Sequence, residues 1–386
     1  MSSIYIHIPF CQSRCIYCDF FSTTSIAKQE DYANCVLREM ELRRNEYASY
    51  AGRDVSRART LSIYIGGGTP STMPPHLLSA LIGKAVSLYD TDENAEITIE
   101  ANPDDVTDEW IAALKQMPVN RVSMGVQTFH DDILATLRRR HSSQQAIDAV
   151  RALQSAGYRN ISIDLIYGLP GQTVERWRQD VEQALQLGVP HISAYSLMFE
   201  DGTRLTAMRD KGLITEMSDE DSELCYNILC QKLKDAGYMH YEVSNFALPG
   251  MHSRHNSGYW TGQPYIGFGA GAHSYDGLDT RRWNASSLAA YINGIKKGEA
   301  TEVYETEKLS ATDLYNEFIM TRLRTSQGFC PDDIEQRFGK SAKDYCLRMA
   351  KPHLQNGNLV ERNDSCLCLS QKGVFVSNDV ISDLFK

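Results

Sequence analysis

The first half of the chain alternates between short strand-like segments and longer helical segments. Six short runs are apolar and rich in residues that favour strands, and they are Ser3–Ile8, Leu61–Ile65, Glu96–Glu100, Arg121–Val126, Ile161–Tyr167 and His191–Leu197. Segments with helical periodicity follow such runs, for example Leu77–Leu88, Glu109–Gln116, Gln144–Ala156 and Val174–Leu187. Six such alternations predict a parallel sheet with right-handed crossovers. The strands are mostly apolar on both sides of the pleat, so we expect a sheet covered by helices.

An eight-stranded barrel and an open doubly wound sheet both fit this pattern. In each of them, chemistry belongs at the C-terminal ends of the strands. The distinctive residues fall there, and they are the cysteines after the first strand, Gly66–Thr69 after the second, Glu100 ending the third, Gln127 after the fourth and Asp164 just before the end of the fifth. We therefore predict an α/β fold with a site at this edge of the sheet.

The pattern changes after about residue 200. A helical stretch is predicted at about Asp219–Ala236, followed by a strand at Met239–Phe246. A loop rich in glycine, histidine and aromatic residues is expected to run to about Gly277. From about Ser286 onwards the chain becomes helical and charged. This second half therefore does not continue the alternation of the first.

The chain is predicted to divide into three parts. Residues 1–235 form the α/β unit, 236–300 a connecting strand and loop, and 301–386 a compact accessory domain of helices and a small β-wing. The wing is the polar, hairpin-like pair Leu359–Glu361 with Leu367–Leu369. A length of 386 residues agrees with more than one domain.

Composition narrows the classes of function. With 42% hydrophobic and 23% charged residues the chain is globular, and a formal net charge of −10 argues against nucleic-acid binding through a basic surface. The N-terminus MSSIYIHIPF lacks the features of a secretory signal, and no apolar stretch has membrane-spanning length. We expect a soluble, cytoplasmic protein, for which any association with the inner face of the membrane would require a partner.

Three of the ten cysteines lie close together directly after the first strand. They are Cys11, Cys15 and Cys18. In a reducing compartment such crowding indicates a metal centre rather than a disulfide. Thiolates are soft ligands, and a fully protein-ligated [4Fe–4S] cubane uses four of them. Three cysteines therefore predict a [4Fe–4S] cluster with one iron open to an outside ligand.

Structural zinc is the alternative interpretation of these cysteines, with His7 or Asp19 as the fourth ligand. Such zinc sites usually draw on two ligand pairs far apart in sequence, and Cys366 and Cys368 flank a single leucine, which is poor spacing for one tetrahedral site. The iron–sulfur interpretation is therefore favoured. The remaining cysteines are predicted to be small buried hydrophobic residues, and they are Cys35, Cys225, Cys230, Cys330 and Cys346.

The motif Cys-x-x-x-Cys-x-x-Cys after a first strand resembles the signature of the radical SAM (S-adenosylmethionine) superfamily. The wider phrase Tyr-Ile-His-Ile-Pro-Phe-Cys, ending at Cys11, resembles the branch that contains oxygen-independent coproporphyrinogen III dehydrogenase and the HemW haem chaperones. The resemblance covers nearly the whole chain. It implies a partial (βα)6 barrel rather than a closed one, SAM on the open iron, and a C-terminal α+β accessory domain, for which a winged helix is one candidate form.

A glycine-rich turn after the second strand is expected to contact SAM. Gly67, Gly68 and Thr69 belong to the run Gly-Gly-Gly-Thr-Pro-Ser, which lets the backbone approach a ligand closely. A tight βα turn is the structural alternative. In the superfamily the equivalent turn lines the amino end of SAM.

Six further positions match SAM-contacting positions in this branch, and they are Tyr5, Tyr17, Glu100, Gln127, Arg139 and Asp164. Glu100 could bind an ammonium or a ribose hydroxyl, with a strand-end salt bridge as the alternative. Arg139, which we expect on a helix, could pair with the methionyl carboxylate, while a solvated helix face is its other interpretation. Asp164 lies among apolar strand residues and needs a hydrogen-bonding partner. Tyr5 would by default pack in the core.

Two departures from the dehydrogenase pattern match the HemW pattern instead. The dehydrogenase has another cysteine two residues after the third, where this chain has Phe20, and it carries a long N-terminal extension, whereas here Cys11 almost begins the sequence. The hexapeptide from His255 to Trp260 matches the His-Asn-x-x-Tyr-Trp motif associated with haem binding in HemW proteins. Both departures and the hexapeptide point to the chaperone side of the branch.

The hexapeptide supplies the candidate haem contacts His255, Asn256, Tyr259 and Trp260. An imidazole can ligate haem iron and aromatic rings can stack on the porphyrin, although a loop histidine is more often a hydrogen-bonding residue. His252 and His273 are weaker candidates for a second axial position.

The resemblance implies a haem chaperone that binds a cluster, SAM and one haem through His255, and transfers haem to apoproteins of the respiratory chain. An electron donor would be needed only if radical chemistry occurs. The alternative is an oxygen-independent coproporphyrinogen III dehydrogenase, which would use the radical made from SAM for oxidative decarboxylation. A zinc-stabilised binding protein is the remote third possibility.

Overall fold

A computed structural model describes residues 2–46, 59–298 and 303–386. The main sheet has twelve strands among the described residues, in the order β12-β11-β10-β9-β1-β2-β3-β4-β5-β6-β8-β7. The central six are parallel, and they are β1 (Ser2–Ile8), β2 (Thr60–Gly67), β3 (Thr91–Ala101), β4 (Arg121–Gln127), β5 (Asn160–Tyr167) and β6 (His191–Ser196). Because β1 and β6 pair with β9 and β8 rather than with each other, the six strands form a partial barrel. The predicted (βα)6 architecture is therefore confirmed.

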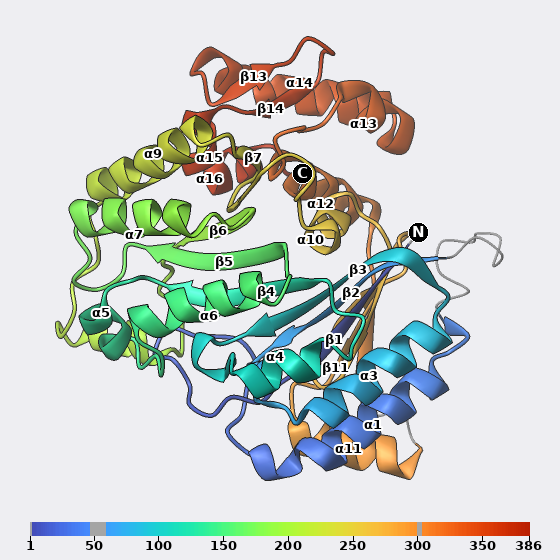
Figure 1. Ribbon diagram of the computed structural model, residues 1–386. Coiled ribbons are helices and arrows are strands. Elements are labelled where there is room, and N and C mark those ends of the chain that lie inside the picture. Colours follow the sequence, from blue (N-terminus) through green and yellow to red (C-terminus); the bar gives the residue numbers. More distant parts are fainter. Residues whose placement is uncertain (1, 47–58, 299–302) are drawn as a thin grey trace.

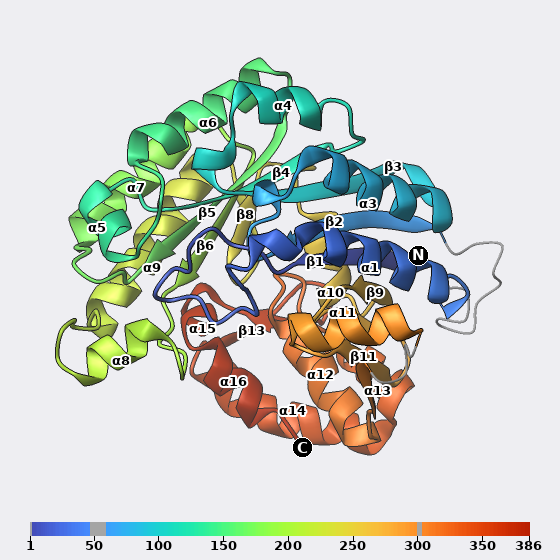
Figure 2. The ribbon, with the colours of Figure 1, turned by 90° about the horizontal axis from the view of Figure 1, so that it is seen from below.

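Helices cover the outer side of the curved sheet (Figures 1 and 2). They are α1 (Gln29–Leu42), α3 (Pro75–Leu88), α4 (Asp108–Leu114), α6 (Ser143–Ser155) and α7 (Val174–Leu187), with the short α5 (Asp131–Thr136) before α6. Local chemistry sets their ends. Ser142 and Gln145 form a capping box at the start of α6, and Thr173 caps α7, which ends at Gly188 with a φ of 64°.

The two faces of the sheet differ in polarity. On β1, Ile4, Ile6 and Ile8 are fully buried under the helices, while Tyr5 and His7 alternate with them on the inner face. The expectation that both faces are apolar was therefore wrong. Only the outer face is covered by helices, whereas the inner face lines the barrel interior and carries polar side chains.

Later strands extend both edges of the same sheet. One edge gains β7 (Met239–Glu242) and β8 (Asn245–Ala247), which follow α8 (Arg204–Asp210) and α9 (Asp219–Asp235). The other edge gains β9 (Tyr265–Phe268), β10 (His273–Tyr275), β11 (Thr280–Asn284) and β12 (Tyr304–Lys308), with α11 (Leu288–Lys297) against α1. The predicted helix before residue 236 is confirmed as α9. The single strand Met239–Phe246 is instead two antiparallel strands joined by a tight turn.

The glycine- and histidine-rich segment is not a loop. It contains the helix α10 (Arg254–Trp260), with Ser253 as its cap, and the strands β9 and β10. Glycine and aromatic content suggested an irregular segment, but contacts with the sheet decide its structure. The three-part division of the chain stays a proposal.

The C-terminal segment has an apolar cluster of its own, which includes Ile319, Ile334 and Val380. Its elements are α12 (Ala311–Leu323), α13 (Pro331–Phe338), α14 (Lys340–Gln355), β13 (Leu359–Glu361), β14 (Leu367–Leu369), α15 (Gln371–Phe375) and α16 (Ser377–Asp383). The predicted hairpin is confirmed, with Leu359 opposite Leu369. Helices followed by a small hairpin match the expected accessory unit.

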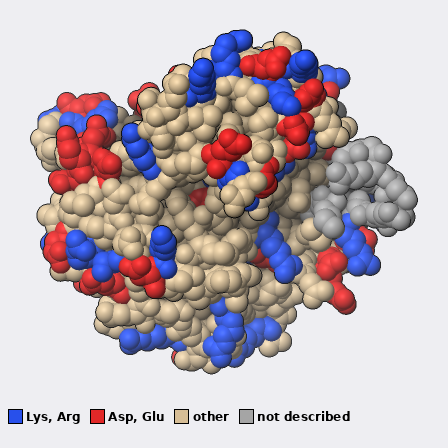
Figure 3. Space-filling model, turned by 90° about the horizontal axis from the view of Figure 1, so that it is seen from above, with Lys and Arg blue, Asp and Glu red and all other residues tan. Residues whose placement is uncertain are grey.

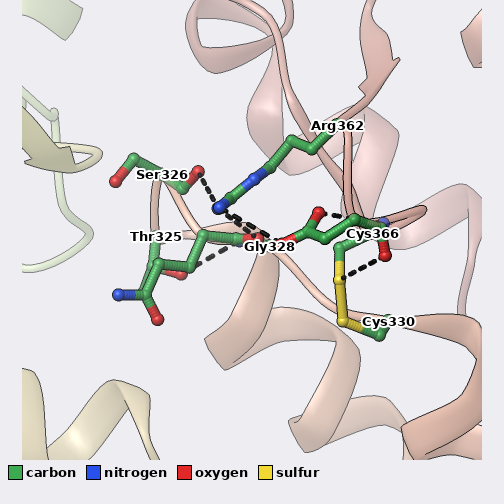
Figure 4. The surroundings of a disulfide bond; sticks show 8 residues. Thr325, Ser326, Gly328, Cys330, Arg362 and Cys366 are labelled. Atoms are coloured by element: carbon green, nitrogen blue, oxygen red, sulfur yellow. Dashed lines mark hydrogen bonds and ion pairs between the residues drawn. A yellow bond between two sulfur atoms is a disulfide. The ribbon is translucent and has the colours of Figure 1, made fainter.

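A disulfide joins Cys330 and Cys366 in this segment (Figure 4). Phe329 and Leu367, their immediate neighbours, exchange backbone hydrogen bonds of 3.0 and 2.8 Å, which bring the two cysteines side by side. The prediction that Cys330 is an unpaired hydrophobic residue was wrong, because 36 residues of sequence separate it from its partner. Cys35, Cys225 and Cys346 are buried as predicted.

Two further properties of the structure concern membrane-spanning helices and surface charge. Within the described ranges no helix is both long and apolar enough to span a membrane. In Figure 3 the middle of the face shown is mostly uncharged, separate patches of lysine and arginine and of aspartate and glutamate lie around its edge, and neither sign dominates it.

Candidate functional site

The three clustered cysteines lie in the loop that leaves the carboxyl end of β1. Cys11, Cys15 and Cys18 are all free and partly exposed. The Cys11 amide donates to the carbonyl of Thr23 at 2.9 Å, and the Ile16 amide donates to Leu137 at 3.3 Å. The loop is therefore fastened to the barrel on both sides while its sulfur atoms remain accessible.

Two side chains from other elements donate toward the cysteine sulfurs. The Thr69 hydroxyl lies 3.5 Å from Cys11 Sγ, and Arg139 Nη1 lies 3.5 Å from Cys15 Sγ. Burial raises the pKa of the Cys11 thiol and raises that of Cys18 to about 11. Because metal ligation requires thiolates, a cluster would have to displace these protons, and the two donors would stabilise the sulfurs once charged.

The donor set fits an iron–sulfur cluster better than a single ion. Among the described residues, no group of three His, Cys, Asp or Glu side chains converges closely enough to hold one metal ion. A cubane spreads its cysteine ligands over several irons, so its thiolates need not meet at one point. His7, a suggested fourth zinc ligand, already uses Nδ1 for the Tyr5 hydroxyl at 2.9 Å and Nε2 for the Phe21 carbonyl at 3.0 Å. The structure thus offers zinc no free imidazole at this position.

The glycine-rich turn lies directly beside Cys11. The amides of Gly68 and Thr69 donate to the carbonyls of Ile8 and Phe10, each at 2.8 Å. A Cβ on Gly68 would lie 3.0 Å from Cys11 Sγ, and Gly67 has a φ of 120° with the His7 ring 2.5 Å from where its Cβ would be. Only glycine fits at these two positions. The turn and the cysteine loop therefore form one edge of the barrel mouth.

Two acidic side chains point into the barrel interior below this edge. Glu100 accepts from the Tyr64 hydroxyl at 2.8 Å and from the Gly67 amide at 2.9 Å. Burial raises the pKa of Glu100 to about 7 and that of Asp164 to about 6, and hydrogen bonding from Ser193 to Asp164 opposes the second shift. Both side chains nevertheless remain partly exposed, so the interior is open to solvent. They suit the binding of cationic or hydroxyl groups.

Arg139 joins the cysteine loop to the ends of two strands. Its Nη2 donates to the Gly125 carbonyl at 2.6 Å and to the side chain of Asn102. The residue lies between α5 and α6, so the expectation of a helical position was wrong. Gln127 ends β4 with a φ of 71°, a conformation uncommon outside glycine. Tyr17 lies within the electrostatic reach of Arg139, whose charge opposes the rise in the tyrosine pKa that burial causes.

The helix α10 places His255 at the other end of the barrel. Glu96, in the middle part of β3, accepts from the amides of Arg254 at 2.9 Å and His255 at 3.1 Å. The imidazole meets Ser62, near the start of β2, while the cysteines follow the end of β1. Figure 1 shows α10 close to the N-terminus. The candidate haem ligand and the candidate cluster site therefore lie at opposite ends of the parallel strands.

Both nitrogens of His255 are engaged, and the residue is 2% exposed. Nδ1 lies 2.9 Å from Ser62 Oγ and Nε2 lies 2.9 Å from the Tyr259 hydroxyl. The ring stacks on Tyr64 with centroids 5.0 Å apart. Burial, assisted by Arg121, lowers the pKa of His255 to about 3, so the imidazole is neutral. A neutral imidazole suits iron, but haem can bind Nε2 only after its hydrogen bond to Tyr259 breaks.

The other predicted haem contacts are distributed around α10. Trp260 lies beneath the Arg324 guanidinium, 5.8 Å from the ring centroid, and its indole N–H is buried without an acceptor. Asn256 is partly exposed on the same helix. His252 stacks on Tyr241 near this end of the barrel, whereas the exposed His273 stacks on Trp283 of β11. The structure brings neither of these histidines into contact with His255.

Comparison with protein families places the chain in a class. The model of the Radical SAM superfamily matches residues 5–184, and the model of the HemN C-terminal domain matches residues 309–376. A solved structure, described as coproporphyrinogen III oxidase (HemN) from Escherichia coli, superposes with a TM-score of 0.83 at 21% identity, covering 100% of this chain and 90% of the other. The fold and the cysteine motif thus define a radical SAM protein, a class that binds a [4Fe–4S] cluster and SAM.

Curated relatives narrow the class to a family. "Heme chaperone HemW" of Lactococcus lactis is 36% identical over 98% of this chain and 96% of its own length. The protein of the same name from Bacillus subtilis is 34% identical over 98% of both chains. Within the radical SAM proteins, the chain belongs to the HemW family.

Several residues of the site were missed by sequence reasoning. Tyr64, Glu96 and Arg121 alternate with isoleucine or valine on their strands, which indicates an inward position once the outer face is known. Ser62 shows the same alternation, between Leu61 and Ile63, whereas Asn102 follows the end of β3 and gave no such signal. Their importance depends on Arg139 and His255, which are distant in sequence.

Proposed function

We propose that this protein is a haem chaperone that carries a [4Fe–4S] cluster and SAM, binds haem through His255 and transfers it to apoproteins of the respiratory chain. The names of the relatives support the haem function. The observation that carries the proposal is the complete hexapeptide on its own helix α10, with His255 buried as a neutral imidazole among aromatic rings.

At the carboxyl end of the barrel, Cys11, Cys15 and Cys18 are the proposed ligands of three irons. SAM, bound at the fourth iron, would supply its sulfonium chemistry there. The residues proposed to hold it are Tyr5, Tyr17, Gly67, Gly68, Thr69, Glu100, Gln127, Arg139 and Asp164, the two glycines through their backbone. Glu100 and Asp164 would receive cationic or hydroxyl groups, and Arg139 an anionic one.

At the amino end, His255 is the proposed axial ligand, with Asn256, Tyr259 and Trp260 around the porphyrin. Ligation at Nε2 requires the Tyr259 hydrogen bond to break, and because His255 is 2% exposed, α10 has to move before haem can reach it. Haem binding is therefore coupled to displacement of α10. This displacement would explain how a chaperone retains haem and later releases it.

Haem titration tests the proposal. His255→Ala should lose stable haem binding and the Soret band of the complex, because the axial ligand is gone. His76→Ala, an exposed position on α3, is the matched control and should bind as the unmodified chain does. Unchanged affinity in His255→Ala would contradict the proposal, and so would conversion of coproporphyrinogen III by the anaerobic protein.

The cluster is tested separately. Anaerobic reconstitution should yield roughly four irons per chain and an EPR signal that SAM perturbs. Substitution of Cys15 by alanine should abolish both, whereas Cys230→Ala should not. Stoichiometric zinc in place of iron would refute the cluster.

A further inference from the structure

Arg121, the first residue of β4, is a buried cation without a hydrogen-bonded or ion-paired partner among the described residues. It is 2% exposed, and its Nε is buried with no hydrogen bond. Within the described ranges, no hydrogen bond or ion pair reaches its guanidinium at all. Removing a charge from water is costly unless it is paired and hydrogen-bonded. Such a guanidinium therefore indicates a site for an anion that enters the interior.

The neighbours of Arg121 on both adjacent strands show the same lack of partners. Thr98 on β3 and Asn160 on β5 lie directly opposite Arg121 in the sheet register. Thr98 Oγ1 and Asn160 Oδ1 are also buried without a hydrogen bond. By the two-residue alternation of strands, this row shares the inner face with Glu100 and Asp164. Three adjacent strands thus present unpaired polar atoms to one part of the interior.

The two nearby carboxylates interact with the charge of Arg121, which opposes the rise in the pKa of Glu100 and Asp164, but neither is hydrogen-bonded to it. Glu100 is held by Tyr64 and Gly67, and Asp164 by hydrogen bonding from Ser193. His191 is engaged by the hydroxyls of Ser162 at 2.7 Å and Tyr241 at 2.8 Å, as His255 is by Ser62 and Tyr259. None of these groups forms an ion pair with Arg121.

We propose that Arg121 binds the carboxylate of a ligand admitted to the barrel interior, with the Thr98 hydroxyl as a second donor; Asn160 Oδ1, an acceptor, takes no part in binding the anion. A guanidinium recognises a carboxylate through paired N–H donors. This inference rests on the proposed function, which offers two carboxylates, the haem propionate and the methionyl group of SAM. Position favours haem, because Tyr64 lies opposite Thr98 in register and its ring stacks on His255. Arg139 is the cation at the cysteine end.

The test compares each acid with an analogue that lacks the carboxylate. The full-length chain, with its cluster reconstituted, is titrated with ferric protoporphyrin IX and its dimethyl ester, and with SAM and decarboxylated SAM. The unmodified chain should bind one of the acids roughly ten- to a hundred-fold more tightly than its analogue. Arg121→Gln should bind that acid and its analogue equally. The acid whose preference over its analogue is lost in Arg121→Gln, haem or SAM, is the source of the carboxylate.

Controls separate a ligand contact from a structural role. Arg59→Gln, which removes an exposed arginine paired with Asp92, should keep the full preference. If Arg121→Gln does not fold, Arg121→Met removes the charge without adding a polar group. A preference that persists for both acids in the folded Arg121 variant overturns the proposal. So does an equal loss of affinity for acid and analogue.

Failure of this inference is distinguishable from failure of the haem function. Haem affinity unchanged in His255→Ala refutes the proposed axial ligand, while the acid and analogue pairs still report on Arg121. Conversely, loss of haem in His255→Ala together with an unaltered acid preference in Arg121→Gln refutes only the carboxylate site.

Discussion

Arg43 and Arg121 are both buried, but their surroundings differ. Arg43 pairs with Glu39 at 2.9 Å, and it also donates to the Gly267 carbonyl at 2.6 Å and the Ser274 hydroxyl at 3.0 Å. This network fastens α1 to β9 and β10. Arg121 has no comparable network among the described residues. One arginine therefore holds the fold, and the other is available to a ligand.

We expect Arg43→Gln to lower the free energy of unfolding by about 3–5 kcal/mol, because it leaves the buried Glu39 carboxylate without its cation. Arg121→Gln should not lower it, since it breaks no pair and removes a buried charge that has no ion-pair partner. Urea unfolding of the two variants measures the difference. Equal destabilisation would show that Arg121 is structural.

Glu100 makes stability depend on pH. Burial raises its pKa from the ordinary 4.5 to about 7, so between these values the folded chain keeps a proton that the unfolded chain has released. The extra proton on Glu100 therefore stabilises the folded chain at pH 5, and this stabilisation is lost as the pH rises through 7. Glu100→Gln should be more stable relative to the unmodified chain at pH 8 than at pH 5. Urea midpoints at both values, measured without the cluster, check this, and a constant difference would contradict it.

At the scale of elements, α10 depends on one carboxylate from β3. Glu96 accepts from two amides at the start of this helix, and the Ser253 hydroxyl also donates to it at 3.4 Å. A negative charge at a helix N-terminus is stabilising, and capping contacts are worth about 0.5–2 kcal/mol. Glu96 thus sets how readily His255 leaves Ser62.

Glu96→Gln should weaken the attachment of α10 to β3 by about 0.5–2 kcal/mol. Hydrogen exchange of the α10 amides should therefore become several-fold faster. Haem should also associate faster, because α10 must move before His255 can ligate. Glu93→Gln, an exposed position on the same strand, is the control and should leave exchange unchanged. Slower or unaltered exchange in Glu96→Gln would refute this role of Glu96.

At the scale of the whole molecule, two separate apolar clusters suggest two stability units. The larger cluster joins the barrel strands to their helices, and the smaller lies within residues 315–384. The Cys330–Cys366 disulfide belongs entirely to the second. The two cysteines are 36 positions apart in the sequence. In the chain-entropy account, a disulfide that closes a loop of this length stabilises the folded state by about 3–4 kcal/mol, because it restricts the unfolded chain.

Cys366→Ser should therefore lower the thermal transition of the C-terminal unit and leave that of the barrel unchanged. Calorimetry with and without reductant measures this. Cys368→Ser is the matched control, because Cys368 is buried nearby and free. A transition insensitive both to reductant and to Cys366→Ser would show that the bond adds no stability.

Sequence alone determined the parts that depend on neighbouring residues. Strand periodicity, helix segments and the spacing of Cys11, Cys15 and Cys18 are local patterns, and they predicted a parallel α/β sheet with the cysteines at its carboxyl edge. The partial barrel followed from the resemblance of the cysteine motif to radical SAM proteins. The hexapeptide likewise identified His255. Its burial could not be predicted, because Ser62, which holds its Nδ1, is 193 residues away.

Tertiary structure alone decided where these parts meet. It placed α10 at the amino end, opposite the cysteines, paired Cys330 with Cys366, and left Arg121 without a hydrogen-bonded or ion-paired partner among the described residues. The polar inner face also emerged only with the curvature of the sheet, which decides which side of each strand helices cover. These outcomes depend on contacts between segments far apart in the chain, and local sequence patterns carry no information about such contacts until the sheet order is known.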